Sequence, residues 1–295
     1  MWLDVDEAAA ARTEGHWSQT SLAGLECRMV PWVRDRGEQR RSEMDNEPDS
    51  KSGVPQLAPA DDIRFPLMEK PAVGMLLACV AGLLNAWTFA RTGTFATVQS
   101  GNVVSAGYNL AQGHWPMVFM ALGTILAFGA GACISAVVIA AFARRMSSFS
   151  AILLSAQGAL LIALAGIAAV PGIAPHHIAL GISFVAGAQG NAFHRTRGMI
   201  YGNIAVTAVL QTAFSFVGRA LARRIHDDGE PHLRWAGIYF LVLLGFAAGA
   251  ALGSVLDMRG PSWAILAAAA ITLAIAALAA LDHRGRVDPT DGPTP

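Results

Sequence analysis

The chain has 295 residues, of which 54% are hydrophobic and only 14% charged, and its formal net charge is zero. A chain this apolar is not typical of a soluble domain and fits a multi-span membrane protein instead. The balanced charge gives no basic footprint, so we expect no nucleic-acid partner. The acidic residues are unevenly spread: 14 of the 21 lie in residues 1–70, and none lies in Pro71–His226.

Residues 1–66 are polar and mixed in charge, and Pro55, Pro59 and Pro66 interrupt their second half. Such a segment buries too little apolar surface to offset its ordering entropy. We therefore predict a disordered N-terminal tail, with a partner-binding arm as the alternative. The first residues are acidic and lack a basic stretch followed by an apolar one, so we expect no secretory signal peptide.

Six apolar runs follow, and an uncharged apolar stretch of about 20 residues is what crosses a hydrocarbon core. The runs are Pro71–Ala90, Trp115–Ala143, Phe149–Val170, Ile178–Phe193, Trp235–Leu256 and Trp263–Leu281. Three of them begin at a Trp, which favours the headgroup level of a bilayer. We predict an integral membrane domain over residues 67–284 and a short C-terminal tail over 285–295.

The membrane domain contains an internal repeat. Val80-Ala-Gly recurs as Val185-Ala-Gly about 105 residues later, and Asn85-Ala-Trp recurs as Asn191-Ala-Phe after a one-residue insertion. Repeat one covers residues 70–172 and repeat two covers 176–283, each with one span, a weaker polar segment and two further spans. Because three crossings is an odd number, tandem copies have opposite orientations in the bilayer, as in many secondary transporters.

The weaker segments are Thr92–His114 and Gly198–Leu221, which are apolar but contain many small polar residues. If they do not cross, nearly all basic residues of the membrane domain lie on the side of the N-terminus. The positive-inside bias then favours six spans with both termini cytoplasmic. Eight spans is the alternative, but it moves four of these arginines outside.

Non-helical backbone is stable at membrane depth only where protein or water satisfies it. We therefore expect the two polar segments to converge near the centre of the bundle and to line any substrate path. The candidate residues are Asn85, Thr88, Arg91, Thr94, Thr97, Gln99, Ser100, Gly101 and Asn102 from the first repeat, and Gln189, Asn191, His194, Arg195, Asn203, Thr207 and Gln211 from the second. The alternative for each residue is a hydrogen bond that joins one helix to another.

The missing carboxylates bear on the class of solute. Cation-coupled carriers usually keep an acid inside the membrane, but none occurs in Pro71–His226. The fixed charges near the polar segments are Arg91, Arg195 and Arg197, and helix N-termini add partial positive charge. We therefore expect a neutral or anionic solute, unless these arginines only extend to the membrane surface.

Small residues four apart form a strip on each of two long runs. They are Gly131 and Ser135 in the second run, and Gly245, Gly249 and Gly253 in the fifth. Such strips let helix backbones approach closely in lipid, so we predict that they pack helices. They also offer a surface for a homo-oligomer.

Other chemistry is not indicated. The three cysteines form no spaced pair, and the histidines have no metal-ligand spacing, so we expect no disulfide, no metal and no cofactor. The membrane domain has no catalytic motif such as GxSxG, HExxH or a P-loop, and we expect no enzyme.

Two stretches resemble the YoaK family of bacterial multi-pass membrane proteins, a family without an assigned function. They are Gly82-Leu-Leu-Asn-Ala-Trp-Thr-Phe with Gln99-Ser-Gly-Asn-Val-Val, and Gly187-Ala-Gln-Gly-Asn-Ala-Phe-His-Arg. The resemblance covers about residues 70–282. It implies about six spans in a bacterial cytoplasmic membrane. Two departures are Asn85, where the family commonly has Asp, and Ser100-Gly-Asn in place of Thr-Gly-Asn.

These observations predict an all-α polytopic helix bundle made of two inverted three-span repeats. The first functional hypothesis is a transporter- or channel-like protein for a small neutral or anionic solute. The second is a membrane scaffold or interaction protein without a substrate. We expect the lipid bilayer as one partner, and a small solute and a second copy of the chain as further candidates.

Overall fold

The computed structural model describes residues 67–142, 149–193, 195–196, 199–200, 206–225 and 229–281. All of them belong to one unit of the chain, Ile63–Pro295. The two predicted tails, 1–66 and 285–295, lie outside the described residues.

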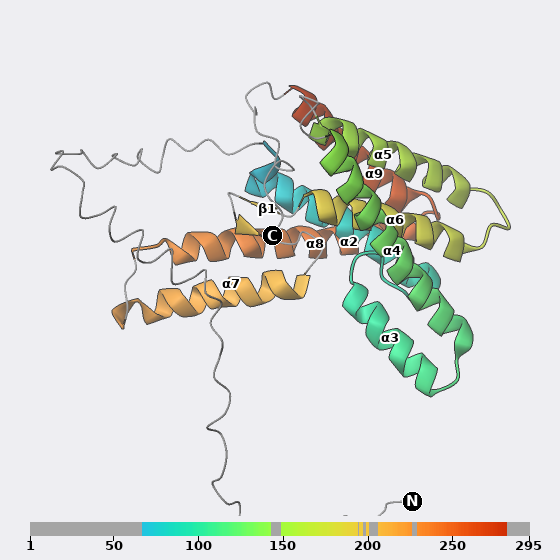
Figure 1. The fold of residues 1–295 in the computed structure, drawn as a ribbon, viewed down its shortest axis with the longest axis horizontal. Coiled ribbons are helices and arrows are strands. Elements are labelled where there is room, and N and C mark those ends of the chain that lie inside the picture. Colours follow the sequence, from blue (N-terminus) through green and yellow to red (C-terminus); the bar gives the residue numbers. More distant parts are fainter. Residues whose placement is uncertain are drawn as a thin grey trace, which may run out of the picture. The chain divides into compact units, whose positions relative to one another are not determined.

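The described residues form α-helices almost throughout, as expected for an all-α protein (Figure 1). The helices are α2 (Pro71–Thr92), α3 (Gln99–Ala111), α4 (Trp115–Phe142), α5 (Phe149–Ala168), α6 (Pro175–Ala192), α7 (Val206–Leu221), α8 (His232–Asp257) and α9 (Trp263–Leu281). The 3-10 turns η2 (Leu67–Glu69) and η4 (Ala222–Arg224) adjoin α2 and α7, and the strands β1 (Arg195–Thr196) and β2 (Met199–Ile200) pair antiparallel. Each long helix begins and ends within a few residues of an apolar run.

Five described helices, α2, α4, α5, α8 and α9, are long and apolar enough to cross a membrane. The chain is therefore a multi-pass membrane protein. The fourth predicted span, α6, has 18 residues but carries His176 and His177 at its start and Gln189 near its end. From Ile178 onward α6 has no exposed residue. A helix enclosed by other helices does not need the apolar surface that lipid requires, and this explains its lower hydropathy.

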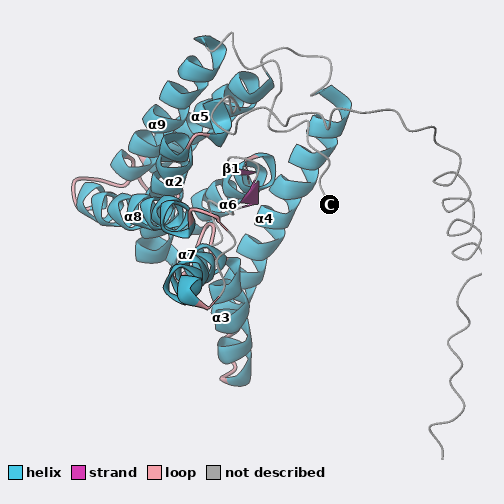
Figure 2. Ribbon diagram, turned by 90° about the vertical axis from the view of Figure 1, so that its left-hand side faces the viewer, coloured by secondary structure: helices cyan, strands magenta, loops and turns pink. Residues whose placement is uncertain are grey.

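The helix contacts are related by an exchange of the two repeats. In this exchange α2 corresponds to α6, α3 to α7, α4 to α8 and α5 to α9. The most extensive contact, α2 with α8, then corresponds to the second most extensive, α4 with α6. In the same way α3 with α4 corresponds to α7 with α8, and α2 with α9 corresponds to α6 with α5. The first helix of each repeat thus packs on the third helix of the other repeat, while α5 and α9 pack together (Figures 1 and 2).

Glycines form both of these inter-repeat contacts, at equivalent positions. A methyl group added at Gly249 of α8 would overlap the carbonyl oxygen of Cys79 in α2. Its counterpart Gly131 of α4 stands in the same relation to the carbonyl oxygen of Phe184 in α6. Ser135, the neighbour of Gly131 one turn on, donates a hydrogen bond of 3.2 Å to the Ala188 carbonyl of α6. The small residues therefore allow backbone-to-backbone packing within one chain.

The register of the contacts gives the directions of the helices. Gly245, Gly249 and Gly253 meet Met75, Cys79 and Leu83 in order, so α8 runs parallel to α2. The C-terminal end of α2 and the N-terminal ends of α4 and α6 line one cavity, so α4 and α6 run opposite to α2. The first long helix of repeat one thus runs opposite to the first long helix of repeat two.

Candidate functional site

The first polar segment starts where α2 stops. Gly93 adopts the left-handed conformation with a φ of 67°, and its N–H donates to the Phe89 carbonyl at 3.0 Å. A residue with a Cβ rarely adopts this conformation, so Gly is the residue that lets the helix end here. The following residues up to Val98 are not helical, although Thr94, Ala96 and Thr97 are buried. Their backbone groups therefore need partners inside the protein.

Two side chains of α2 supply some of those partners. The Asn85 amide accepts the Thr97 N–H at 3.0 Å and donates to the Thr97 hydroxyl. One turn on, the Thr88 hydroxyl accepts the Ala96 N–H at 3.1 Å. Both side chains are at most 4% exposed. The two residues thus hold the loop against α2.

Asn102 of α3 holds the same loop from the other side. Its side-chain oxygen accepts the Phe95 N–H at 2.9 Å, and its nitrogen donates to the Phe95 carbonyl at 2.7 Å. The nitrogen also donates to Gln99 at 2.8 Å, and Gln99 donates to the Ala96 carbonyl at 2.8 Å. Asn102 is fully buried. Its polar atoms therefore serve the loop rather than a cavity.

α3, the helix that follows this loop, packs along α4. Three residues separate the end of α3 from the start of α4, and the two helices pack together. The first residues of α3 line a cavity with Phe128, which lies halfway along α4. α3 is therefore a short helix that starts beside the middle of α4 and packs along it (Figure 2).

α7 stands in the equivalent relation to α8. Phe214 packs edge-on against Phe240 at 5.4 Å between ring centroids, and Phe216 lies 5.8 Å from Tyr239. Val209, nearer the start of α7, is clustered with Tyr239 and Val242, on which Phe246 also packs. The N-terminal half of α7 thus lies beside the middle of α8, as α3 does beside α4.

A cavity of about 440 Å³ lies between the N-terminal turns of α3 and α7. This volume is within the range of small-molecule sites. It is lined by Thr97, Val98, Gln99, Ser100, Phe128, Val206, Thr207, Ala208 and Gln211. Five of these residues belong to the predicted substrate path, and they come from both repeats. Two helix N-termini border the cavity, and each carries partial positive charge.

One face of α7 leads away from this cavity. Thr207 and Gln211 line it, and Ser215 and Arg219 follow on the same face at intervals of four residues. All four are exposed in the chain. An apolar face on the same helix, formed in part by Val209 and Ala213, is buried. The polar face would be costly to expose to lipid tails, because nothing there can hydrogen-bond it.

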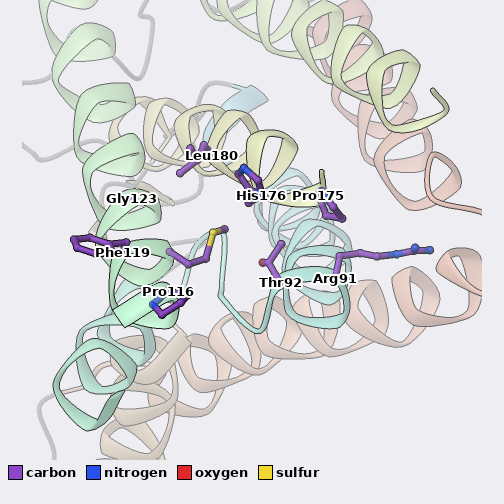
Figure 3. Close-up of a pocket in the computed structure, with 9 residues that line it drawn as sticks. Arg91, Thr92, Pro116, Phe119, Gly123, Pro175, His176 and Leu180 are labelled. Atoms are coloured by element: carbon purple, nitrogen blue, oxygen red, sulfur yellow. The ribbon is translucent and has the colours of Figure 1, made fainter. Parts of the chain in front are cut away.

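Arg91 lies elsewhere. Its Nε donates to both carboxylate oxygens of Asp257 in α8, at 3.0 and 3.2 Å. It borders a second cavity of about 470 Å³ at the ends of α2, α4 and α6, together with Thr92, Phe119 and His176. Figure 3 shows the Arg91 side chain extending away from this cavity. The lining that remains is largely apolar.

The other predicted path residues have separate positions. Gln189 donates to the Leu77 carbonyl of α2 at 3.3 Å, and Asn191 lies 3.5 Å from the Ser135 hydroxyl of α4, so both connect α6 to other helices. Gly101 packs against the ring of Phe95. His194 and Asn203 lie outside the described residues, and Arg195 is described only as part of β1.

Three features of the structure were not anticipated from the sequence. Phe128 in the cavity and Asp257 opposite Arg91 gave no signal, because their contacts join distant parts of the chain. Gln157 in α5 is 4% exposed and has no hydrogen-bond partner. Its signal was present, since it is the one Gln in the apolar run Phe149–Val170. No cluster of three or more metal-ligating side chains occurs among the described residues.

Comparisons with known proteins gave one match. The profile of a family described as "Protein of unknown function (DUF1275)" matches residues 73–278. Neither the curated proteins nor the solved structures contain a significant match to the chain.

Proposed function

The chain belongs to the DUF1275 family, whose function is unknown, and we propose that it is a transporter- or channel-like protein for a small neutral or anionic solute. The observation that carries this proposal is the cavity between the N-terminal turns of α3 and α7, because polar residues from both repeats meet there. Broken segments that meet near mid-depth between repeats are the usual site of substrate in secondary transporters.

We further propose that the membrane domain is an inverted repeat. The parallel pairing of α2 with α8 and the opposite direction of α6 support it. In this arrangement α6 is the sixth span, and α3 enters from one side while α7 enters from the other. The two three-helix groups, α2 with α7 and α8, and α6 with α3 and α4, would then move relative to each other around the cavity.

The class of solute follows from charge. No Asp or Glu occurs in Pro71–His226, and the cavity is bordered by two positive helix ends without a carboxylate. A cation would be repelled there, whereas a neutral or anionic solute would not. This absence of acids also argues against an intramembrane enzyme, and we propose none.

The orientation is proposed from the basic residues. Lys70, Arg219, Arg223 and Arg234 lie at the end of the bundle where α2 begins and α7 ends. The opposite end has Arg91 and Arg259, and Arg91 is paired with Asp257. The positive-inside bias supports cytoplasmic termini. With the resemblance to YoaK sequences, we propose a bacterial cytoplasmic membrane location.

A scaffold without a substrate is the second candidate. Asn85, Thr88 and Asn102, three of the predicted path residues, make hydrogen bonds to the loop 93–98. In addition, the glycine strips pack helices inside one chain. If the cavity is dry, these features are sufficient for a stable bundle that serves as a binding platform.

Thiol accessibility distinguishes the two candidates. Thr207→Cys and Gln211→Cys would be made in a chain whose native cysteines are replaced, with Leu210→Cys as the control on another face of α7. The purified protein in liposomes would be treated with two membrane-impermeant methanethiosulfonates, one anionic and one cationic. We expect both cavity thiols to react and Leu210→Cys to stay unmodified.

We also expect the ratio of anionic to cationic rates to exceed that of a small thiol in water. If no cavity thiol reacts, the transport proposal is wrong and the scaffold is favoured. If the cationic reagent is relatively faster, the proposed class of solute is wrong, although the wet cavity stands.

A further inference from the structure

Two buried polar side chains lie away from the cavity between α3 and α7. Gln157 of α5 is 4% exposed, and neither its side-chain nitrogen nor its oxygen has a hydrogen-bond partner in the structure. Ser183 of α6 is completely buried, and its hydroxyl has none either. The two helices pack against each other.

Several other buried hydroxyls in the bundle are satisfied within their own helix. Thr272 donates to the Ala268 carbonyl at 2.8 Å, and Thr124 donates to the Ala121 carbonyl at 2.8 Å. This is the usual solution for Ser and Thr in membrane helices. Ser183 does not use it. The side chains of Gln157 and Ser183 are therefore exceptions to this pattern among the residues that the structure describes.

The surroundings of Gln157 are apolar. Leu154 and Leu161, one turn away on either side, are fully buried. Farther along α5, Leu164 packs against Gly181 of α6, two residues before Ser183. Burying an amide in such surroundings is unfavourable if the amide makes no hydrogen bond. A protein retains a buried amide of this kind when something bonds to it, and buried water is the usual partner.

We propose that Gln157 of α5 and Ser183 of α6 each bind ordered water inside the bundle. The ligand is uncharged, since no Lys, Arg, Asp or Glu is among the buried residues that the structure describes. The site does not depend on the proposed transport function. It holds whether the cavity between α3 and α7 is wet or dry.

Radiolytic footprinting in ¹⁸O-labelled water tests this in the unmodified protein. Hydroxyl radicals formed from a bound water oxidise the side chains beside it, even where bulk water has no access. We expect ¹⁸O incorporation at Leu154 or Leu161 in the wild-type protein, and its loss in Gln157→Leu. Thr272→Val is the control, because it removes a buried hydroxyl that already has a partner, and we expect it to leave the oxidation unchanged.

Absence of oxidation at both leucines in the wild type would overturn the proposal for Gln157. Equal oxidation in wild type and Gln157→Leu would overturn it as well, since the water would then not be held by the amide. If Gln157→Leu does not fold, Ser183→Ala supplies the same comparison at Ile182. Leu and Gln have similar volumes, so we expect the Gln157 variant to fold.

Discussion

The Asn85 side chain of α2 pairs with Thr97 of the following loop through two hydrogen bonds, one to the backbone N–H at 3.0 Å and one to the hydroxyl. The pair joins residues on both sides of the helix end at Gly93. It fixes a buried, non-helical segment whose N–H groups have no helical partner. Asn85 is therefore a structural residue of the loop, whatever else the neighbouring cavity binds.

Replacement of Asn85 by Leu is expected to destabilise the protein by about 2–4 kcal/mol, because it leaves two buried groups of Thr97 unpaired. Asn85→Asp is expected to cost less. A carboxylate still accepts the Thr97 N–H, and the Thr97 hydroxyl can turn to donate to it. The measurement is thermal unfolding in detergent, followed by tryptophan fluorescence. Equal losses in the two variants would contradict the hydrogen-bond geometry.

Asn102→Leu is expected to release the loop 93–98 from α3. The side chain makes two bonds to Phe95, so its loss should lower the unfolding temperature and raise amide hydrogen exchange at Phe95. Asn109→Leu is the matched control on the same helix, because Asn109 bonds only to Ser105 of its own helix. If exchange at Phe95 were the same in both variants, the role of Asn102 would be refuted.

The two glycine contacts between the repeats are expected to respond alike. Gly131→Ala and Gly249→Ala each place a methyl group onto a carbonyl oxygen of the facing helix. We expect each to destabilise by about 1–3 kcal/mol, the usual cost of overpacking. The measurement is again the unfolding temperature in detergent.

Matched controls lie on the same two helices. A methyl group added at Gly129 of α4 or Gly237 of α8 meets no atom within 4 Å. Alanine is the better helix former, so both control variants should be neutral or more stable, by up to about 1 kcal/mol. A loss at the controls as large as at Gly131 and Gly249 would mean that the repeats do not pack as described.

The ion pair between Arg91 and Asp257 is expected to contribute little. The Arg91 side chain is 34% exposed, and pairs of this kind contribute about 0.2–1 kcal/mol. We expect a double-mutant cycle with Arg91→Leu and Asp257→Asn to give a coupling energy in that range. Higher salt should reduce it. A coupling above about 2 kcal/mol would indicate that the pair is enclosed, for example by lipid headgroups or a second copy of the chain.

The structure bears on each sequence prediction separately. The long helices α2, α4, α5, α8 and α9 were predicted to within a few residues, since an uninterrupted apolar stretch specifies a membrane helix by composition alone. The sequence also predicted a span at Ile178–Phe193, which forms most of α6, but α6 is not among the five described helices that are long and apolar enough to cross a membrane. From Ile178 onward neighbouring helices enclose α6, so that it has no exposed residue, and hydropathy along the sequence does not contain the neighbours.

The tertiary structure separates the predicted substrate-path residues into two groups, those that line a cavity and those that join helices. Thr97, Gln99, Ser100, Thr207 and Gln211 meet at one cavity, whereas Arg91, Gln189 and Asn191 lie at helix contacts. All eight are polar residues that lie near the C-terminal end of α2 or α6, or in the polar segment that follows each of these helices. Which of them face a cavity depends on the direction in which α3 and α7 return along α4 and α8, and no local pattern encodes that direction.

The sequence by itself determined that this chain is a helical membrane protein with two related halves, because apolar composition and internal repetition are properties of the residues alone. Only the tertiary structure decided that the first helix of each half packs on the third helix of the other. That pairing depends on carbonyl groups meeting glycines across repeats, as at Cys79 and Gly249. Tertiary packing also left Gln157 without a protein partner, since an amide is satisfied or not by what surrounds it.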